Sequence, residues 1–492
     1  MRLALTIGCI MMAMAVQSQV RNHPMSMLYR LEGERLALVA DSGAVTSFYP
    51  MNSARVSLDS AFYYTRTRKY YFAYQEKILR DPLFYVKGED FKIGIDPVFD
   101  FRFGKDFADT TAYADSVKLV GNTRGMRIEV DLGKNVSIQT SFYENQVHLP
   151  VYLRDYANET GVVPGMGRHK KFKDAGFDYA NSFGWINWQV RPWLRLEAGQ
   201  GKHFIGNGYR SLLLSDAASA YPYLKAVVES PNRKWTYHTM GVKLQSLDRQ
   251  PLGEVPESLF KVKNATFHYL TYKPARWLEV GLFEGVIWKR WDDDKGTLPA
   301  SWAMYVPLPG LGSSGMEGNN KGTMVQGLNL NGGSKQLRGY VQLGFEGNSL
   351  NKTQLGFKLF DFPVAGLMVQ VENNLSNGKE VFVGANAQDG YTHQNEYLAF
   401  GGGPRTNEWM GLAHYHRKRV LIMAKFNYIE RIDFSVARIY EGSLGYLINP
   451  NSGLSFRMGI TNRNMTSGAQ QSLTNFVYWS FSTLLWQSYS DF

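Results

Sequence analysis

A run of cations is the feature of the sequence that most directly suggests binding chemistry. Within residues 168–173 lie Arg168, Lys170, Lys171 and Lys173, preceded by glycines that favour a loop. Clustered ammonium and guanidinium groups attract carboxylates and phosphates. On an outward-facing loop these side chains would bind acidic polysaccharide, and the alternative is a solvated charge run without a ligand.

A second candidate site combines an aromatic ring with a cation. Tyr209 and Arg210 follow Gly206-Asn207-Gly208, whose glycines permit a tight turn. An aromatic face can stack on a sugar ring, and a guanidinium can pair with a sugar carboxylate. The alternative is that the glycines only shape a turn, while Arg210 points inward and balances buried carboxylates.

A third candidate lies at Trp288 and Trp291, which precede the three consecutive aspartates 292–294. These residues open the longest expected loop, 291–336, which is rich in Gly, Asn and Ser. Indole rings suit carbohydrate, but the aspartates lack the spacing of a calcium loop. We therefore expect sugar contact and no metal, and the alternative is a solvated loop that folds inward.

The sequence offers no recognisable catalytic constellation. No serine occupies a G-x-S-x-G frame, and no H-E-x-x-H motif occurs. His414 and His416 share one face of an expected strand, but no third zinc ligand is indicated. We expect neither an enzyme nor a bound cofactor.

Composition indicates the class of protein that must position these residues. The chain has 492 residues, of which 14% are aromatic, 20% are charged and 48 are glycine. It contains no apolar run of about 18 residues, so a helical membrane protein is excluded, and its aromatic content excludes a disordered chain. A β-rich protein remains.

The first residues predict export. Residues 1–18 combine Arg2, an apolar run and small residues, the plan of a signal peptide that is cleaved before Gln19. Cleavage would remove Cys9, the only cysteine, and with it any thiol chemistry. The formal net charge of +11 suggests anionic partners outside the cytoplasm, such as surface polysaccharide or lipopolysaccharide, and no nucleic acid.

Alternation with a period of two dominates the chain after about residue 90. In residues 126–132, Met126, Ile128, Val130 and Leu132 share one face and three charged residues share the other. So many two-faced strands exceed what a two-sheet sandwich usually holds. We therefore predict an all-β fold, a transmembrane antiparallel β-barrel of about 16–18 strands with lipid on its apolar face.

Aromatic residues fit the ends of such strands. Tryptophans cluster at one hairpin (Trp185, Trp188, Trp193) and recur near both ends of later strands (Trp277, Trp288; Trp479, Trp486), as interface girdles would. The last residue, Phe492, resembles the terminal aromatic that closes the last strand of many outer-membrane barrels.

Residues 19–90 follow a different pattern. Apolar residues near helical spacing between Asp59 and Arg80 predict one or two helices that end at Pro82. The predicted organisation is a signal peptide at 1–18, a periplasmic helical or plug region at 19–90, and the barrel at 91–492.

Two segments carry a resemblance to a known family. Residues 201–216 read GKHFIGNGYRSLLLSD, and residues 391–409 read YTHQNEYLAFGGGPRTNEW. Both are similar to the Wzi-type capsule assembly proteins, especially the Bacteroidetes branch that includes gliding-motility proteins of the RemB kind. Phe400-Gly401 stands where a His-Pro pair is common in that family.

The resemblance implies an outer-membrane barrel that holds capsular or exopolysaccharide at the cell surface, with adhesion or gliding motility as the variant of that branch. Two other hypotheses stay open. One is a channel whose basic faces select anionic solutes. The other is a barrel subunit of a secretion or motility complex, in which the N-terminal region contacts a periplasmic partner.

Overall fold

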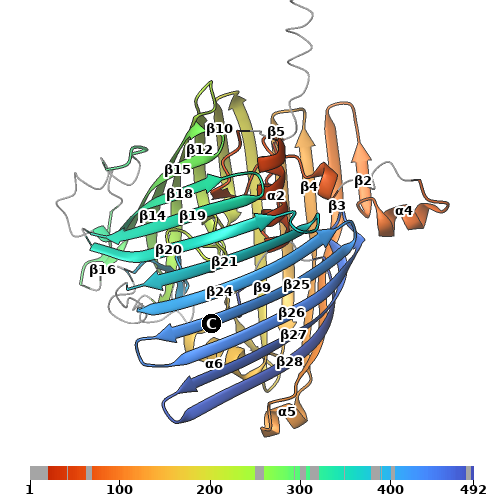
Figure 1. Ribbon diagram of the computed structural model, residues 1–492, viewed down its shortest axis with the longest axis vertical. Coiled ribbons are helices and arrows are strands. Elements are labelled where there is room, and N and C mark those ends of the chain that lie inside the picture. Colours follow the sequence, from red (N-terminus) through yellow and green to blue (C-terminus); the bar gives the residue numbers. More distant parts are fainter. Residues whose placement is uncertain are drawn as a thin grey trace, which may run out of the picture.

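The computed structural model describes residues 20–40, 43–62, 69–249, 260–292, 294–299, 306–310, 321–347, 349–377, 388, 390–400, 405–483 and 489–492. The expected signal peptide, Cys9 and Trp486 lie outside these residues. Eighteen antiparallel strands close into a barrel, which confirms the predicted fold class (Figure 1). The strands are β3 (Phe91–Asp106), β4 (Leu119–Leu132), β5 (Val136–Val147), β9 (Gly176–Arg191), β10 (Leu194–Gly201), β12 (Tyr221–Glu229), β13 (Trp235–Arg249), β14 (Phe260–Ala275), β15 (Leu278–Lys289), β18 (Lys321–Gly333), β19 (Leu337–Glu346), β20 (Ser349–Phe360), β21 (Leu367–Ser376), β24 (Thr406–Arg417), β25 (Val420–Arg431), β26 (Val436–Asn449), β27 (Leu454–Ser467) and β28 (Gln470–Ser482).

The barrel closes where its last strand meets its first. β28 pairs with β3 from Phe476 opposite Asp106 to Ser482 opposite Asp100. Each other barrel strand pairs with the strands before and after it around the wall. Closure satisfies the edge hydrogen bonds that an open sheet would expose to lipid.

The two ends of the barrel differ in their connections. At one end, the short-turn end, strands are joined by connections such as 192–193 and 418–419. The other end, the long-loop end, carries the connections 148–175, 202–220, 290–320 and 377–405. The expected loop 291–336 is therefore too long, because residues 321–333 belong to β18 and alternate in the same way as their neighbours.

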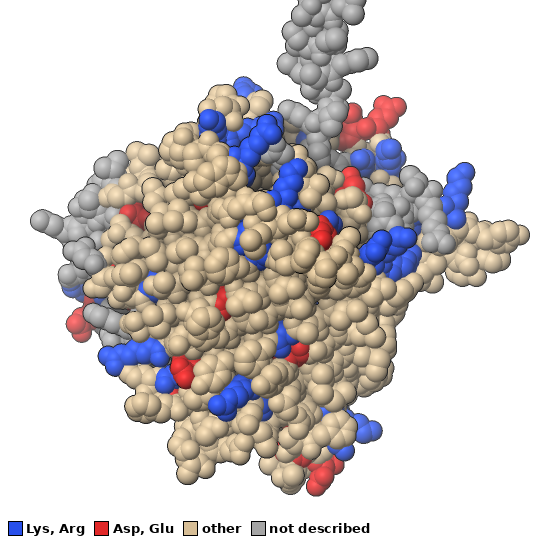
Figure 2. All heavy atoms as spheres, viewed as in Figure 1, with Lys and Arg blue, Asp and Glu red and all other residues tan. Residues whose placement is uncertain are grey.

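Alternation on β4 follows the prediction. Met126 and Leu132 are exposed on the outside, while Asp131 is buried and accepts hydrogen bonds from Arg21 inside the barrel. Charged side chains are sparse over the strand wall in Figure 2. The outer face thus presents the apolar surface that a bilayer requires.

The interior is filled by segments from distant parts of the chain. Helix α2 (Met27–Ala40) lies inside the barrel, and β1 (Phe48–Tyr49) pairs with β11 (Phe204–Ile205) of the infolded connection 202–220 (Figure 1). The short helix α3 (Asp59–Phe62) packs against α2 through the stacked rings of Phe62 and Tyr29, 4.3 Å apart. We call α2, β1 and α3 the plug.

The remaining helices are short and lie at the ends of the barrel. They are α4 (Ala73–Leu79), α5 (Ala112–Ser116) and α6 (Val151–Thr160). The helix expected between Asp59 and Arg80 is thus represented by α3 and α4, and residues 63–68 are not described. Among the residues that the structure describes, no helix is long and apolar enough to cross a membrane.

Two expectations about aromatic residues are wrong. Trp185 points into the barrel rather than into an interface girdle, whereas Trp188 and Trp193 are half exposed on the outside. Trp288 has the outward phase of Leu282 on β15 but is fully buried, so it does not belong to an exposed girdle either. Phe492 does not close the last strand. β28 ends at Ser482, and Phe492 packs against Tyr156 of α6 with ring centroids 4.8 Å apart, because residues 489–492 fold inward.

Candidate functional site

The predicted basic run forms a hairpin at the long-loop end. β8 (Lys170–Phe172) pairs with the start of β9, on the edge that β10 leaves free beyond Gly184. Its turn places Lys173 at a φ of 52°. We call residues 167–178 the basic hairpin.

All four cations of the basic hairpin are exposed. They are Arg168, Lys170, Lys171 and Lys173. The Arg168 guanidinium lies 5.1 Å from the centroid of the Phe260 ring, and the Lys173 ammonium lies 5.3 Å from that of Phe172. Cations supported by aromatic faces and open to solvent can meet a polyanion without leaving a buried partner unpaired.

A second, smaller hairpin holds the base of the basic hairpin in place. It consists of β22 (Thr392–His393) and β23 (Glu396–Tyr397), joined by Gln394 and Asn395 with φ values of 47° and 61°. Two positive φ values suit a two-residue hairpin turn, and Asn tolerates them well. We call residues 391–398 the clamp.

The clamp contacts the basic hairpin and its neighbours through polar groups. The Gly165 amide donates to Glu396 Oε1 over 2.6 Å, and the Arg168 amide donates to Gln394 Oε1 over 3.2 Å. Lys202 Nζ donates to the Gly165 carbonyl over 2.6 Å. Burial raises the pKa of Glu396 to about 8, against the opposing effects of the Gly165 amide and Lys202.

Tyr209 and Arg210 are buried in the lumen, whereas the cations of the basic hairpin are exposed. Arg210 is only 7% exposed. Its Nη2 lies 2.9 Å from Glu408 Oε1, and its Nη1 lies 3.1 Å from Asp491 Oδ1. Tyr209 Oη donates to Asp491 Oδ2 over 2.8 Å. These contacts match the alternative in which Arg210 balances buried carboxylates.

Opposite charges stabilise the Asp491 carboxylate at this position. Burial acts against the charged form, but Arg210 and Lys425 outweigh it and hold the pKa of Asp491 below its ordinary value. Lys425 also pairs with Glu441 on β26 at 2.9 Å. Arg210 and Lys425 therefore each have carboxylate partners, and Asp491, Glu408 and Glu441 each have a cation, as buried charges require.

The two tryptophans of the third candidate site differ in how deeply they are buried. Trp288 is fully buried, and its Nε1 donates to Thr266 Oγ1 over 3.0 Å. Trp291 is half-buried in the hairpin of β16 (Trp291–Asp292) and β17 (Gly296–Thr297). Asp292 Oδ1 accepts hydrogen bonds from the amides of Asp294 and Lys295, so it caps a turn. Asp293 lies outside the described residues.

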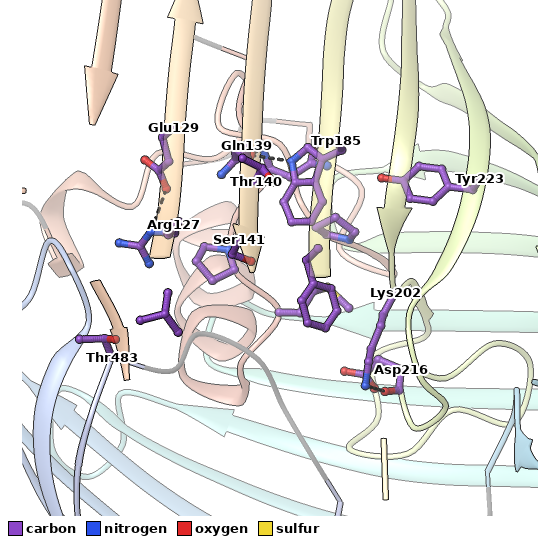
Figure 3. Close-up of a pocket in the computed structure, with 16 residues that line it drawn as sticks. Arg127, Glu129, Gln139, Thr140, Ser141, Trp185, Lys202, Asp216, Tyr223 and Thr483 are labelled. Atoms are coloured by element: carbon purple, nitrogen blue, oxygen red, sulfur yellow. Dashed lines mark hydrogen bonds and ion pairs between the residues drawn. The ribbon is translucent and has the colours of Figure 1, made fainter. Parts of the chain in front are cut away.

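A cavity of about 80 Å³ lies between the barrel wall and residues that flank the plug, namely Asn22, Pro24, Met25 and Pro50. In Figure 3, Trp185 and Tyr223 border it, with Arg127 and Glu129 to one side and Lys202 and Asp216 to the other. Several of its lining residues also line a wider cavity of about 480 Å³ that reaches the β4–β5 turn at the short-turn end. The inward ring of Trp185 thus contributes to the interior and not to the membrane interface.

The two segments that carry the resemblance pack against each other inside the barrel. The Ser215 amide donates to the Leu398 carbonyl over 2.6 Å, and Tyr391 Oη donates to the Leu213 carbonyl over 2.8 Å. Residues 401–404, which include part of the departure from the family pattern, lie outside the described residues. Each segment also contacts the basic hairpin or the residues next to it, through Gln394 with Arg168 and through Lys202 with Gly165.

Comparison with solved structures identifies a protein with a similar fold. The chain superposes on Wzi of Escherichia coli, described as an outer membrane protein involved in group 1 capsule assembly and a carbohydrate-binding β-barrel, with a TM-score of 0.54. The fold is that of Wzi. The match covers 94% of this chain and 99% of Wzi at 12% sequence identity, so the likeness to Wzi concerns the fold.

Other barrels match less well. OccAB4 of Acinetobacter baumannii superposes with a TM-score of 0.46 at 8% identity, covering 80% of this chain and 98% of that protein. OccK5 of Pseudomonas aeruginosa gives 0.43 at 10% identity, with coverage of 80% and 98%. No family model matches the chain, and no curated protein does.

Sequence reasoning missed the partners of Arg210, and it singled out the clamp only through the resemblance of residues 391–409, without a structural role. Glu372, whose Oε1 accepts a hydrogen bond from the Arg210 amide over 3.1 Å, lies on β21, and Glu408 and Lys425 lie on β24 and β25. All three occupy inward positions, where any polar residue of a barrel strand is expected. Their inward phase was readable from the sequence. Their convergence on Arg210 and Asp491 was not, because the contacts span up to 281 positions of the chain.

Proposed function

We propose that this protein is an outer-membrane barrel that binds acidic polysaccharide at the cell surface through the basic hairpin, without catalysis. The observation that carries the proposal is the exposure of Arg168, Lys170, Lys171 and Lys173 on one supported hairpin at the long-loop end. Long loops face outward in outer-membrane barrels. The fold shared with carbohydrate-binding Wzi supports the same conclusion.

The proposal includes the expected organisation of the chain. Residues 1–18 act as the export signal, residues 19–90 supply the periplasmic plug region, and residues 91–492 form the barrel in outer-membrane lipid. The first barrel strand begins at Phe91, and α2 lies within the lumen, which supports this division.

The interior argues against the alternative of a channel for anionic solutes. The plug, the connection 202–220, the clamp and residues 489–492 occupy the space that a pore would need. Arg30 of α2 illustrates this packing, since its guanidinium lies 3.6 Å from the centroid of the Phe204 ring and 3.6 Å from Asp216. A role in adhesion or gliding motility, with a periplasmic or motility-complex partner, stays a prediction.

The test compares two variants that remove the same charge from opposite ends. The first changes Arg168, Lys170, Lys171 and Lys173 to Ser, and the second changes the exposed cations Lys134, Arg191, Lys234 and Arg417 of the short-turn end to Ser. Since each exposed ion pair contributes about 0.2–1 kcal/mol, we expect the first variant to bind acidic polysaccharide about tenfold or more weakly. The second variant should bind as the unchanged protein does.

Binding is measured on purified protein by titration with an acidic and a neutral polysaccharide, and by surface retention in cells at equal expression. Binding to the acidic polymer should weaken with added salt because exposed charges are screened. If both variants lose affinity for acidic polysaccharide equally, net charge alone explains the binding. If neither variant loses affinity, the basic hairpin has no role in binding.

A further inference from the structure

Residues 69–87, which hold α4 and the short strand β2 (Phe84–Lys87), lie outside the barrel wall, in contrast to the plug. In Figure 1, α4 projects beyond β2 and β3, away from the lumen. The segment is attached to the short-turn end. Asn449 Nδ2 donates to the carbonyls of Lys77 and Asp81 over 3.3 and 3.1 Å, and Arg419 Nη2 donates to that of Leu79 over 3.3 Å. We call residues 69–87 the outer segment.

The outer segment exposes large apolar side chains at a density unusual for a surface facing water. Tyr71 is 89% exposed and Phe84 is 63% exposed, and the others are Phe72, Tyr74, Ile78, Leu83, Tyr85 and Val86. Tyr74 and Ile78 lie four positions apart, hence on the same face of α4. A contiguous apolar patch of this kind marks a site of interaction with a membrane or a protein.

The register of β2 joins this patch to the outer face of the barrel. Phe84 lies opposite Ile95 and Val86 lies opposite Ile93, so each pair shares one side of the sheet. On β3 the residues of the other phase, such as Asp96 and Asp100, are buried towards the lumen. Phe84 and Val86 therefore continue the outward surface.

The seam of the barrel explains why this edge is available. β28 leaves β3 at Asp100, and β2 pairs with the same strand at residues 92–95, closer to the short-turn end. Further along β3, Phe101 and Phe103 are exposed on the outside beside β28. The patch is thus continuous with the surface that faces lipid in the proposed function.

Charge around the patch also favours a lipid surface. Residues 69–87 contain four Lys or Arg and two carboxylates, and Lys69 and Lys87 at its two ends are exposed. Aromatic rings at the boundary of the acyl chains, with cations near the phosphates, describe an interfacial membrane segment.

We propose that the outer segment is an interfacial anchor, whose aromatic side chains enter the periplasmic leaflet beside the barrel and whose cations meet phospholipid headgroups. This proposal depends on one part of the proposed function, namely that the barrel spans the outer membrane, and it does not depend on polysaccharide binding. It would fix the depth of the short-turn end and cover the seam between β28 and β3.

The test uses the full chain with Cys9 changed to Ser and one new cysteine carrying a nitrobenzoxadiazole label, in vesicles of phosphatidylcholine and phosphatidylglycerol. The label is placed by Tyr74→Cys on the patch, by Leu282→Cys on the outward face of β15, and by Lys134→Cys on an exposed turn of the same end. Quenching by doxyl-labelled lipid reports contact with the bilayer. We expect quenching at 74 and 282 and none at 134.

The three positions separate the possible failures. Quenching at 282 but not at 74 overturns the anchor alone and leaves the patch as a surface for a periplasmic protein. Loss at both positions overturns the membrane location of the barrel as well. In a further variant with Tyr71→Ser, Phe72→Ser and Ile78→Ser, all exposed, quenching at 74 should fall by half or more while that at 282 stays. An unchanged signal at 74 would also overturn the proposal.

Discussion

The basic hairpin and the lumen cluster around Arg210 use the same kinds of residue in opposite ways. In the hairpin, four cations are exposed and the contacts that hold them are made mainly by the backbone. In the lumen, Arg210 is enclosed by Glu408 and Asp491, and Lys425 shares Asp491. A cation open to water is free to meet a ligand, whereas an enclosed one holds the fold together.

The plug resembles the lumen cluster, because its charged side chains are also enclosed by partners of opposite charge. Glu34 of α2 pairs with Lys358 of β20, and Glu32 pairs with His416 of β24. These contacts connect the plug to wall strands far along the chain. The comparison therefore predicts that changes in the lumen alter stability and closure, while changes in the basic hairpin alter binding.

The largest effect is expected for Arg210→Ala. This change leaves the buried carboxylates of Glu408 and Asp491 without their guanidinium, which typically costs about 3–5 kcal/mol. Arg168→Ala, the matched change in the basic hairpin, should alter the free energy of unfolding by about 0.5 kcal/mol or less. Urea unfolding in detergent micelles measures both. Similar shifts for the two variants would abolish the distinction between the regions.

An intermediate effect is expected for Lys358→Ala on the closure of the lumen. Glu34 then remains as an unpaired charge between α2 and β20, so the plug should loosen. Planar bilayers should show little conductance for the unchanged protein and clear openings for this variant. The double variant Glu34→Gln with Lys358→Met removes both charges and should restore closure. A high conductance of the unchanged protein would instead favour the channel.

The smallest effect concerns the clamp and pH. Because the pKa of Glu396 is raised from 4.5 to about 8, its contribution to stability is complete below 4.5 and is lost as pH rises through 8. Hydrogen exchange at the Gly165 and Arg168 amides, corrected for intrinsic rates, should accelerate between about pH 4.5 and 8 and level off above pH 8. Glu396→Gln, which mimics the protonated acid, should remove this dependence. The same acceleration in both proteins would assign it to another group.

The strands could be predicted because their signal is local. Met126, Ile128, Val130 and Leu132 alternate with charges, and a period of two leaves one face for lipid and one for the lumen. The helix α2 could not be predicted in the same way. Arg30, Glu32 and Glu34 are buried beside Leu28 and Leu31, so its polar residues face partners on other strands and no polar side is left for water.

The candidate site was predictable in part for the same reason. The exposure of Lys170 and Lys171 follows from a loop rich in glycine and charge. The burial of Trp288 and Arg210 does not, since the same residue types suit a membrane interface, a sugar site or a packed lumen. For Arg210, only the inward folding of the connection 202–220 and of residues 489–492 separates these possibilities, because it brings Arg210 against Asp491. Trp288, on the outward face of β15, is instead buried with Val286 and Met324.

The sequence by itself determined the phase of each strand and hence the barrel, because side chains alternate along a strand wherever it lies. The tertiary structure decided which cations are enclosed, since closure of the barrel brings Arg210 against Asp491 and Glu34 against Lys358. Pairing across hundreds of positions depends on the shape of the closed lumen, and no local pattern encodes that shape.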